Sequence, residues 1–158
     1  MAVLHYDGSL TSDRASYGGL IRNAMGVPIL AYVGKREEAS ILSMELLAIY
    51  RGISLCLEKD IQNISIRFDS KLAVDILNGT ITCPWSVYVL KCRITVFLDQ
   101  LPHKEIRHVW RELNQPTYFI ASIDNGDGES IIYPLDFPGD LLGLIQNDAV
   151  RKTHFRPP

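Results

Sequence analysis

Short apolar runs separated by polar turns organise the start of the chain. Residues 2–6, 15–22 and 28–33 are apolar and β-prone, and turns at residues 11–14 and around Gly26 separate them. Two successive hairpin connections predict three antiparallel strands.

The rest of the chain alternates between helical and strand patterns. Residues 40–59 predict a helix with Ser40 or Ser43 as its N-cap. The elements expected after it are a strand at 64–68, helices at 70–77 and 87–101, a strand at 105–112, and a helix from Pro116 to about Gly126. This order predicts a mixed sheet covered by helices, in an α/β or α+β layout.

The last part of the chain differs in composition, because residues 127–158 hold four of the eight prolines. We therefore expect one domain over residues 1–126 and a Pro-rich C-terminal extension over residues 127–158. The extension should pack on the domain or be partly disordered.

Composition narrows the class of protein. Hydrophobic residues make up 47% and charged residues 22%, the profile of a globular domain, and no apolar run approaches the roughly 20 residues that span a membrane. No secretion signal is visible, and the three cysteines form no CxxC pair, so we expect reduced thiols and an intracellular location, in the cytoplasm or nucleus. A net charge of -2 argues against a dedicated nucleic-acid binder.

Three carboxylates stand at positions that invite chemistry. Asp7 ends the first strand and precedes Gly8, Asp69 ends the fourth predicted strand, and Glu45 falls on the core-facing side of the helix between them. Each has a simpler explanation. Asp7 could open an Asp-Gly turn, Glu45 could form a buried salt bridge or reach the helix end, and Asp69 could cap the next helix, although Ser70 could do so equally well.

Taken together, the three carboxylates predict a metal site. If the first and fourth strands are neighbours, Asp7, Glu45 and Asp69 converge at one edge of the sheet. Clustered carboxylates repel one another, and Mg²⁺ or Mn²⁺ is the usual remedy, because hard oxygen ligands select these ions. Such sites activate water and stabilise phosphoryl transfer.

The same residues carry a family resemblance. The segments YDGSL, IRFDSK and IRHVWRELNQ, with the glutamate of the helix SMELLAIYRG between the first two, resemble the ribonuclease H-like domain in its plant form, a reverse-transcriptase-like module. The resemblance covers nearly all of residues 3–121. It implies a ribonuclease H-like α/β fold, with a five-stranded mixed sheet whose first three strands are antiparallel and which helices flank.

The resemblance also implies two-metal hydrolysis of the RNA strand of an RNA–DNA hybrid. Asp7 would bridge both metals, and Glu45 and Asp69 would help to hold the metal on the leaving-group side. The substrate contacts expected at this edge are Gly8, Ser9, Ser70 and Asn114.

One position departs from the family. Its fourth carboxylate lies in a motif of the form N-x-x-A-D-x-L-A, and the matching run here, NQPTYFIA, has Tyr118 in place of the aspartate. A phenol is neutral at pH 7 and a poor magnesium ligand. Among other acidic residues, Asp124 falls on the wrong face of the helix unless the helix breaks, and Glu112 is expected to point at solvent. The acidic residues of the extension, Asp127, Glu129 and Asp136, could fold back to substitute.

Two hypotheses follow. The chain is a metal-dependent endoribonuclease, weakened at Tyr118, that cleaves the RNA strand of RNA–DNA hybrids or duplex RNA. Alternatively, it is a catalytically inactive nucleic-acid- or protein-binding domain on the same scaffold. In either case we expect a monomer that does not bind membranes.

The loop at residues 79–86 is uncharged and so lacks a basic protrusion. We expect Trp85 to pack this loop down rather than stack on a ligand. His108 is expected at the surface or satisfied by a partner, with proton shuttling as the alternative.

Overall fold

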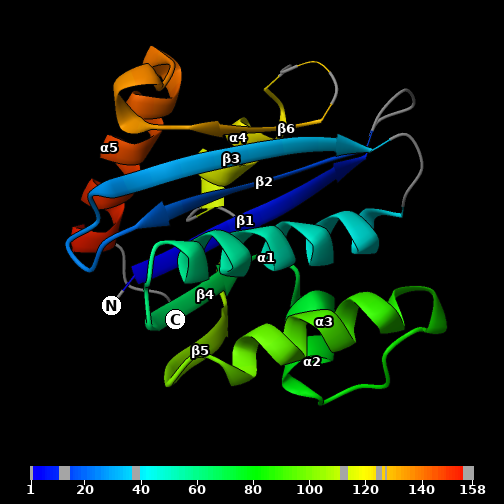
Figure 1. Cartoon of the computed structure of the whole chain (residues 1–158). Helices are drawn as coiled ribbons and strands as arrows, with labels where there is room; N and C mark the ends of the chain where they lie inside the picture. The colour runs from blue at the N-terminus through cyan, green and yellow to red at the C-terminus, as the bar shows by residue number, and fades with distance from the viewer. Residues whose placement is uncertain are drawn as a thin grey trace.

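A six-stranded mixed sheet forms the centre of the described structure, a computed structural model (Figure 1). It describes residues 2–10, 15–36, 40–110, 114–123, 126 and 128–154. The strands are β1 (Ala2–Leu10), β2 (Ala15–Arg22), β3 (Pro28–Arg36), β4 (Asn63–Phe68), β5 (His103–His108) and β6 (Glu129–Ile132). Their order across the sheet is β5-β4-β1-β2-β3-β6.

The pairing follows the predicted pattern. The first three strands are antiparallel, and β4 and β5 extend the sheet in parallel from β1. The mixed α/β sheet is therefore confirmed. The strand count is not, because β6 from the C-terminal segment pairs antiparallel with the outer edge of β3.

Helices cover both faces of the sheet (Figure 1). The helical elements are α1 (Ile41–Glu58), α2 (Lys71–Asn78), α3 (Tyr88–Asp99), α4 (Gln115–Ala121) and α5 (Gly139–His154), with short 3₁₀ turns η1 (Trp85–Val87) and η3 (Pro134–Asp136). The first three helices pack on one face and α4 and α5 on the other, and each face has its own hydrophobic core. None of the helices in the described residues is long and apolar enough to cross a membrane.

Local chemistry sets the ends of α1 and α2. Ser40 and Ser43 form a reciprocal capping box, in which each side-chain oxygen accepts the other residue's backbone N–H, at 3.1 and 3.0 Å. Gly79 ends α2 in the left-handed conformation, with φ of 76°, which an L side chain adopts only at a cost.

The predicted fifth strand was displaced. It runs from His103 to His108 instead of over 105–112, because its partner β4 ends at Phe68, which is paired with His108. Beyond that point Val109 donates a last hydrogen bond, of 2.8 Å, to the carbonyl oxygen of Phe68. Residues 111–113 lie outside the described part of the chain.

The C-terminal segment is packed on the sheet. Glu129 of β6 accepts two hydrogen bonds of 2.9 Å from the Arg51 guanidinium of α1. On the opposite face Phe137, Leu141 and Ile145 are buried against β2, β3 and α4. The segment therefore completes both the sheet and the second core.

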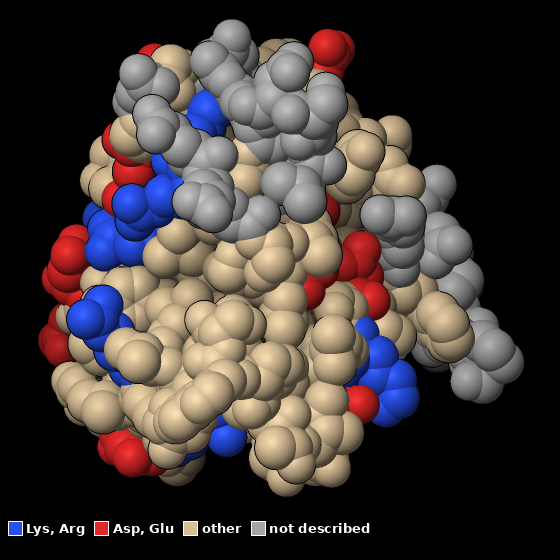
Figure 2. All heavy atoms as spheres, turned by 90° about the vertical axis from the view of Figure 1, so that its right-hand side faces the viewer, with Lys and Arg blue, Asp and Glu red and all other residues tan. Residues whose placement is uncertain are grey.

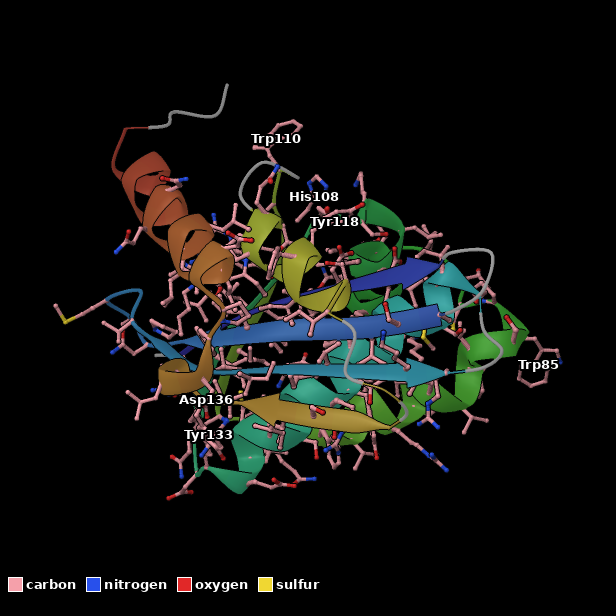
Figure 3. The ribbon with its side chains drawn as sticks, turned by 90° about the horizontal axis from the view of Figure 1, so that it is seen from above. Trp85, His108, Trp110, Tyr118, Tyr133 and Asp136 are labelled. Atoms are coloured by element: carbon pink, nitrogen blue, oxygen red, sulfur yellow. The ribbon has the colours of Figure 1, made fainter. Side chains whose placement is uncertain are left out.

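The expectation for Trp85 was wrong. Its side chain is 84% exposed and makes an edge-to-face contact with Tyr88, at 5.2 Å between ring centroids. In Figure 3 it lies far from the other labelled aromatic side chains. Figure 2 shows a broad area without acidic or basic side chains in the lower part of the face that it presents.

Candidate active site

The parallel pairing of β1 and β4 places two of the predicted carboxylates, Asp7 and Asp69, towards the same end of these two neighbouring strands. His5 is opposite Arg67 in the register, so two residues further along Asp7 comes opposite Asp69. Asp7 lies within β1, opposite Gly18 of β2, and is 6% exposed. Asp69 directly follows the last residue of β4. The condition on which the predicted metal site depends, that the first and fourth strands are neighbours, is met. Asp7 does not end its strand as expected, because β1 continues to Leu10.

Gly8 brings the helix that carries Glu45 against this edge. A Cβ atom at Gly8 would lie 2.7 Å from the backbone nitrogen of Glu45 and 2.9 Å from the carbonyl carbon of Met44. Real Cβ atoms do not approach backbone so closely, so only glycine lets β1 pass directly beneath α1 at this point. The dipeptide Asp7–Gly8 thus sets the carboxylate beside the first turn of α1.

Glu45 is partly buried, and its pKa is shifted by its surroundings. Burial, opposed by a hydrogen bond with Ser70 and reinforced by the negative charge of Asp69, raises the pKa of Glu45 from 4.5 to about 7. No cationic side chain is among the causes of this shift, so it gives no support to the salt-bridge explanation for Glu45.

Ser70 has two roles at this edge. Its side chain interacts with Glu45, and its Oγ accepts the backbone N–H of Ala73 at 3.3 Å as the N-cap of α2. The helix is therefore capped by Ser70 and not by Asp69. Of the two alternatives left open by the sequence, the structure supports the serine.

Tyr6 is a residue that sequence reasoning missed. Its side chain is fully buried and stacks on Phe68, with 4.2 Å between ring centroids. Burial raises its pKa well above 10, and the charges of Glu45, Asp69 and Asp7 raise it further, in that order. All three predicted carboxylates therefore act on one hydroxyl group. In the described residues this hydroxyl has no hydrogen-bond partner.

The donor set fits a divalent cation in its chemistry. Asp7, Glu45 and Asp69 supply hard carboxylate oxygens, which Mg²⁺ and Mn²⁺ prefer, and the negative charge of Asp69 adds to the effect of burial in raising the pKa of Glu45. Within the described ranges, no group of three histidine, cysteine, aspartate or glutamate side chains is spaced closely enough to hold an ion. Ion binding would therefore require the three carboxylates to close together.

The family's fourth position lies on the other face of the sheet. Asn114, just before α4, is buried, and its Nδ2 donates a hydrogen bond of 3.2 Å to the backbone oxygen of Tyr6. Tyr118 follows one helical turn later and is 56% exposed. Asn114 thus joins the start of α4 to β1 beside Asp7, while Tyr118 presents a phenol where the family has a carboxylate.

The substitutes for that carboxylate find no support among the described residues. Glu129 lies on the edge strand β6, where its carboxylate accepts hydrogen bonds from Arg51 and from the Tyr17 hydroxyl. Asp136 is exposed on η3, and Figure 3 shows it far from Tyr118. The other three, Glu112, Asp124 and Asp127, lie outside the described residues.

His108 lies at the surface with a partner, as expected. Its Nε2 is 3.0 Å from the backbone oxygen of Asp69.

Figure 2 faces the end of the molecule at which β1 ends, and acidic side chains gather near the centre of this face.

A pH dependence of stability follows from Glu45. Because its pKa is raised, the folded protein holds this proton more tightly than the unfolded chain, and this contribution to stability is lost as the pH rises from about 4.5 to about 7. Glu45→Gln removes the buried charge. We therefore expect it to raise the Tm clearly at about pH 8 and little at about pH 4, measured by thermal unfolding in EDTA.

Glu58→Gln is the matched control, because Glu58 is an exposed glutamate at the end of the same helix. If the Tm difference between Glu45→Gln and the wild type is equal at both pH values, the raised pKa of Glu45 is contradicted.

Comparison with known proteins supports the fold. The reverse transcriptase-like family matches residues 5–123. The structure is similar to ribonuclease H1 from the archaeon Halobacterium salinarum, with a TM-score of 0.72, 19% sequence identity, and coverage of 76% of this chain and 93% of that one. No curated protein matches the chain.

Two further solved structures are similar. The N-terminal ribonuclease H domain of a Mycobacterium tuberculosis protein matches with a TM-score of 0.72 at 18% identity, covering 76% of this chain and 89% of that one. LC11 ribonuclease H1, solved in complex with an RNA/DNA hybrid, matches with a TM-score of 0.69 at 18% identity, covering 76% and 93%. The α/β fold is thus a ribonuclease H-like fold, and the chain belongs to the reverse transcriptase-like family.

Proposed function

We propose that the protein is a metal-dependent endoribonuclease that cleaves the RNA strand of RNA–DNA hybrids or duplex RNA, with a rate lowered by Tyr118. The observation that supports this proposal is the neighbouring positions of Asp7 and Asp69 on β1 and after β4, together with the negative charges of Glu45, Asp69 and Asp7, which all raise the pKa of the buried Tyr6 hydroxyl. Clusters of carboxylate oxygens are typical of sites that bind divalent cations.

Asp7, Glu45 and Asp69 are the residues that would hold Mg²⁺ or Mn²⁺. Such an ion supplies Lewis-acid stabilisation of the phosphate and lowers the pKa of bound water. The hydrogen bond between Ser70 and Glu45 orients one of the carboxylates, and the packing of Gly8 beneath α1 fixes Asp7 relative to Glu45. Among the predicted substrate contacts, Gly8, Ser9 and Ser70 flank the carboxylates in the chain. Asn114 acts through β1, because it is buried against Tyr6.

The substrate class is proposed from the fold and from the surface. LC11 ribonuclease H1 was solved with an RNA/DNA hybrid, and its fold is shared here. Recognition of A-form duplexes depends on shape, phosphates and 2′-hydroxyls, so duplex RNA is an equally reasonable substrate. The net charge of -2 favours modest affinity that falls with salt.

A second candidate is a catalytically inactive nucleic-acid- or protein-binding domain. Tyr118 favours it, because a neutral phenol stands where the family has its fourth metal-binding carboxylate. In the described residues no other acidic side chain takes that place.

A cleavage assay decides between the two. End-labelled RNA–DNA hybrid, duplex RNA and duplex DNA are incubated with the protein in Mg²⁺, in Mn²⁺ and in EDTA. We expect RNA-strand cleavage of the first or second substrate that depends on the metal and disappears in EDTA. Binding without cleavage in either metal would support the inactive domain.

Three expectations from the sequence remain proposals. Free Cys56, Cys83 and Cys92 support an intracellular location. The plant form of the family is proposed from the sequence resemblance alone, as is the monomeric state.

A further inference from the structure

Two exposed aromatic side chains lie on the segment after β5 and on α4, and one of them, Tyr118, stands where the family has its fourth acidic residue. Trp110 is 47% exposed and Tyr118 is 56% exposed, and neither belongs to the two hydrophobic cores of the described residues. Figure 3 shows them, with His108, gathered at one edge of the molecule. These three residues are called the aromatic rim below.

The β5 side of the rim is fixed relative to Asp69. His108 pairs with Phe68 at the end of the sheet, and its Nε2 is 3.0 Å from the backbone oxygen of Asp69. Trp110 meets the imidazole edge-to-face, with 6.0 Å between ring centroids and 73° between the planes. The hydrogen bond of Val109 to Phe68 holds the backbone between the two rings. The indole is therefore positioned by contacts that begin at the site itself.

The α4 side of the rim is fixed relative to Asp7. Asn114 binds the backbone of Tyr6, the residue before Asp7, and Tyr118 lies one turn further along α4. A Cβ at Gly18, the β2 partner of Asp7, would lie 3.0 Å from the backbone nitrogen of Ala121, so α4 sits close to the sheet here. Tyr118 and Trp110 thus belong to two different segments, each tied to the backbone beside one of the two aspartates.

The chemistry of the rim favours a planar, uncharged group. Aromatic rings stack on the face of any base, and such stacking stabilises the bound base. The neighbouring acidic residues repel a phosphate unless a cation is bound. A base within a duplex is already stacked on its neighbours and cannot offer its face, so the group must be unpaired.

We propose that Trp110, Tyr118 and His108 form a binding site for an unpaired nucleobase of an RNA strand, next to the phosphate held at the carboxylates. The inference rests on the proposed function, because it places that phosphate at Asp7, Glu45 and Asp69. It predicts that the protein prefers a duplex whose RNA strand has unpaired flanks to a blunt duplex.

The test uses binding and not turnover. Three labelled RNA–DNA hybrids are compared by fluorescence anisotropy in Ca²⁺: a blunt hybrid, one with unpaired adenosines at both ends of the RNA strand, and one whose flanks are abasic. A denaturing gel verifies that the RNA stays intact. We expect the adenosine-flanked hybrid to bind about tenfold more tightly than the abasic one, and to quench tryptophan fluorescence.

Variants locate the effect. Trp110→Ala is expected to remove the preference for adenosine flanks, and Trp110→Phe to keep most of it, because the ring remains. Trp85→Ala is the matched control, since Trp85 is the other exposed tryptophan of the described residues and lies away from the rim. It should leave the preference unchanged. Circular dichroism checks that each variant is folded.

Failure of this inference is distinguishable from failure of the proposed function. Equal binding of adenosine-flanked and abasic hybrids would overturn the base site, even if the blunt hybrid is cleaved. A preference that Trp85→Ala removes and Trp110→Ala does not would overturn it as well. A preference that depends on Trp110, in a protein that cleaves nothing, would support the base site and refute the nuclease.

Discussion

Asp7→Asn is expected to lower metal-dependent cleavage of an RNA–DNA hybrid by about 10³-fold or to background, while the protein stays folded. Asp7 is the buried carboxylate at the centre of the proposed site, opposite Asp69 in the extended register and beside Glu45 through the close packing of Gly8. Asparagine has the same shape and keeps an oxygen, but it removes the negative charge that would bind the cation and stabilise its water.

The control for Asp7→Asn is Asp136→Asn, because Asp136 is an exposed aspartate on η3, far from the site (Figure 3). It should cleave as the wild type does. Circular dichroism and the Tm separate a lost charge from a lost fold. Full cleavage by folded Asp7→Asn protein would remove the proposed site.

Tyr118→Asp is expected to raise cleavage of a blunt hybrid by about 100-fold, because it supplies the charge that the family has at this position. Tyr118 is exposed and its ring belongs to neither hydrophobic core of the described residues, so the substitution should cost little stability. A blunt hybrid is the right substrate for this measurement, since it does not engage the aromatic rim.

Two further variants separate charge from shape at this position. Tyr118→Asn has the size of the aspartate without its charge, and Tyr118→Phe keeps the ring without the hydroxyl. Neither should raise the rate. A gain with Tyr118→Asn equal to that with aspartate would show that removal of the ring, and not a new ligand, is the cause. Brisk cleavage by the wild type, with no gain from aspartate, would refute the weakened site.

The sequence predicted most of the fold because the pattern and the packing agree. Strands β1 to β4 and helices α1 to α4 alternate in apolar periodicity with turn residues between them, and each buries the face that its pattern indicates. Strand β6 was missed because four residues carry too little pattern, and its pairing depends on the free edge of β3 and on Arg51. Trp85 was placed wrongly because an aromatic residue in an uncharged loop gives no sign of whether it packs or stays exposed.

The sequence predicted the carboxylates of the candidate site but not the residues whose roles depend on how separate elements pack. The strand pattern gave the placement of Asp7 on β1 and of Asp69 directly after β4, and the sheet shows that these two strands are neighbours. The pattern did not show that β1 continues past Asp7 to Leu10. Tyr6 was missed because its role depends on the charges around a buried hydroxyl, and these come from three separate elements. Its place directly before Asp7 was the one signal available. The burial of Asn114 depends on how α4 docks on β1, which no local pattern encodes.

The central claim is that Asp7, Glu45 and Asp69 bind a divalent cation, and a crystal soaked in Mn²⁺ tests it most directly. Anomalous scattering locates the ion independently of any assumption about turnover. We expect a Mn²⁺ ion in contact with all three carboxylates in wild-type crystals and its loss in crystals of Asp7→Asn. Saturating Mn²⁺ that leaves no ion at these carboxylates, with the three side chains still apart, would contradict it.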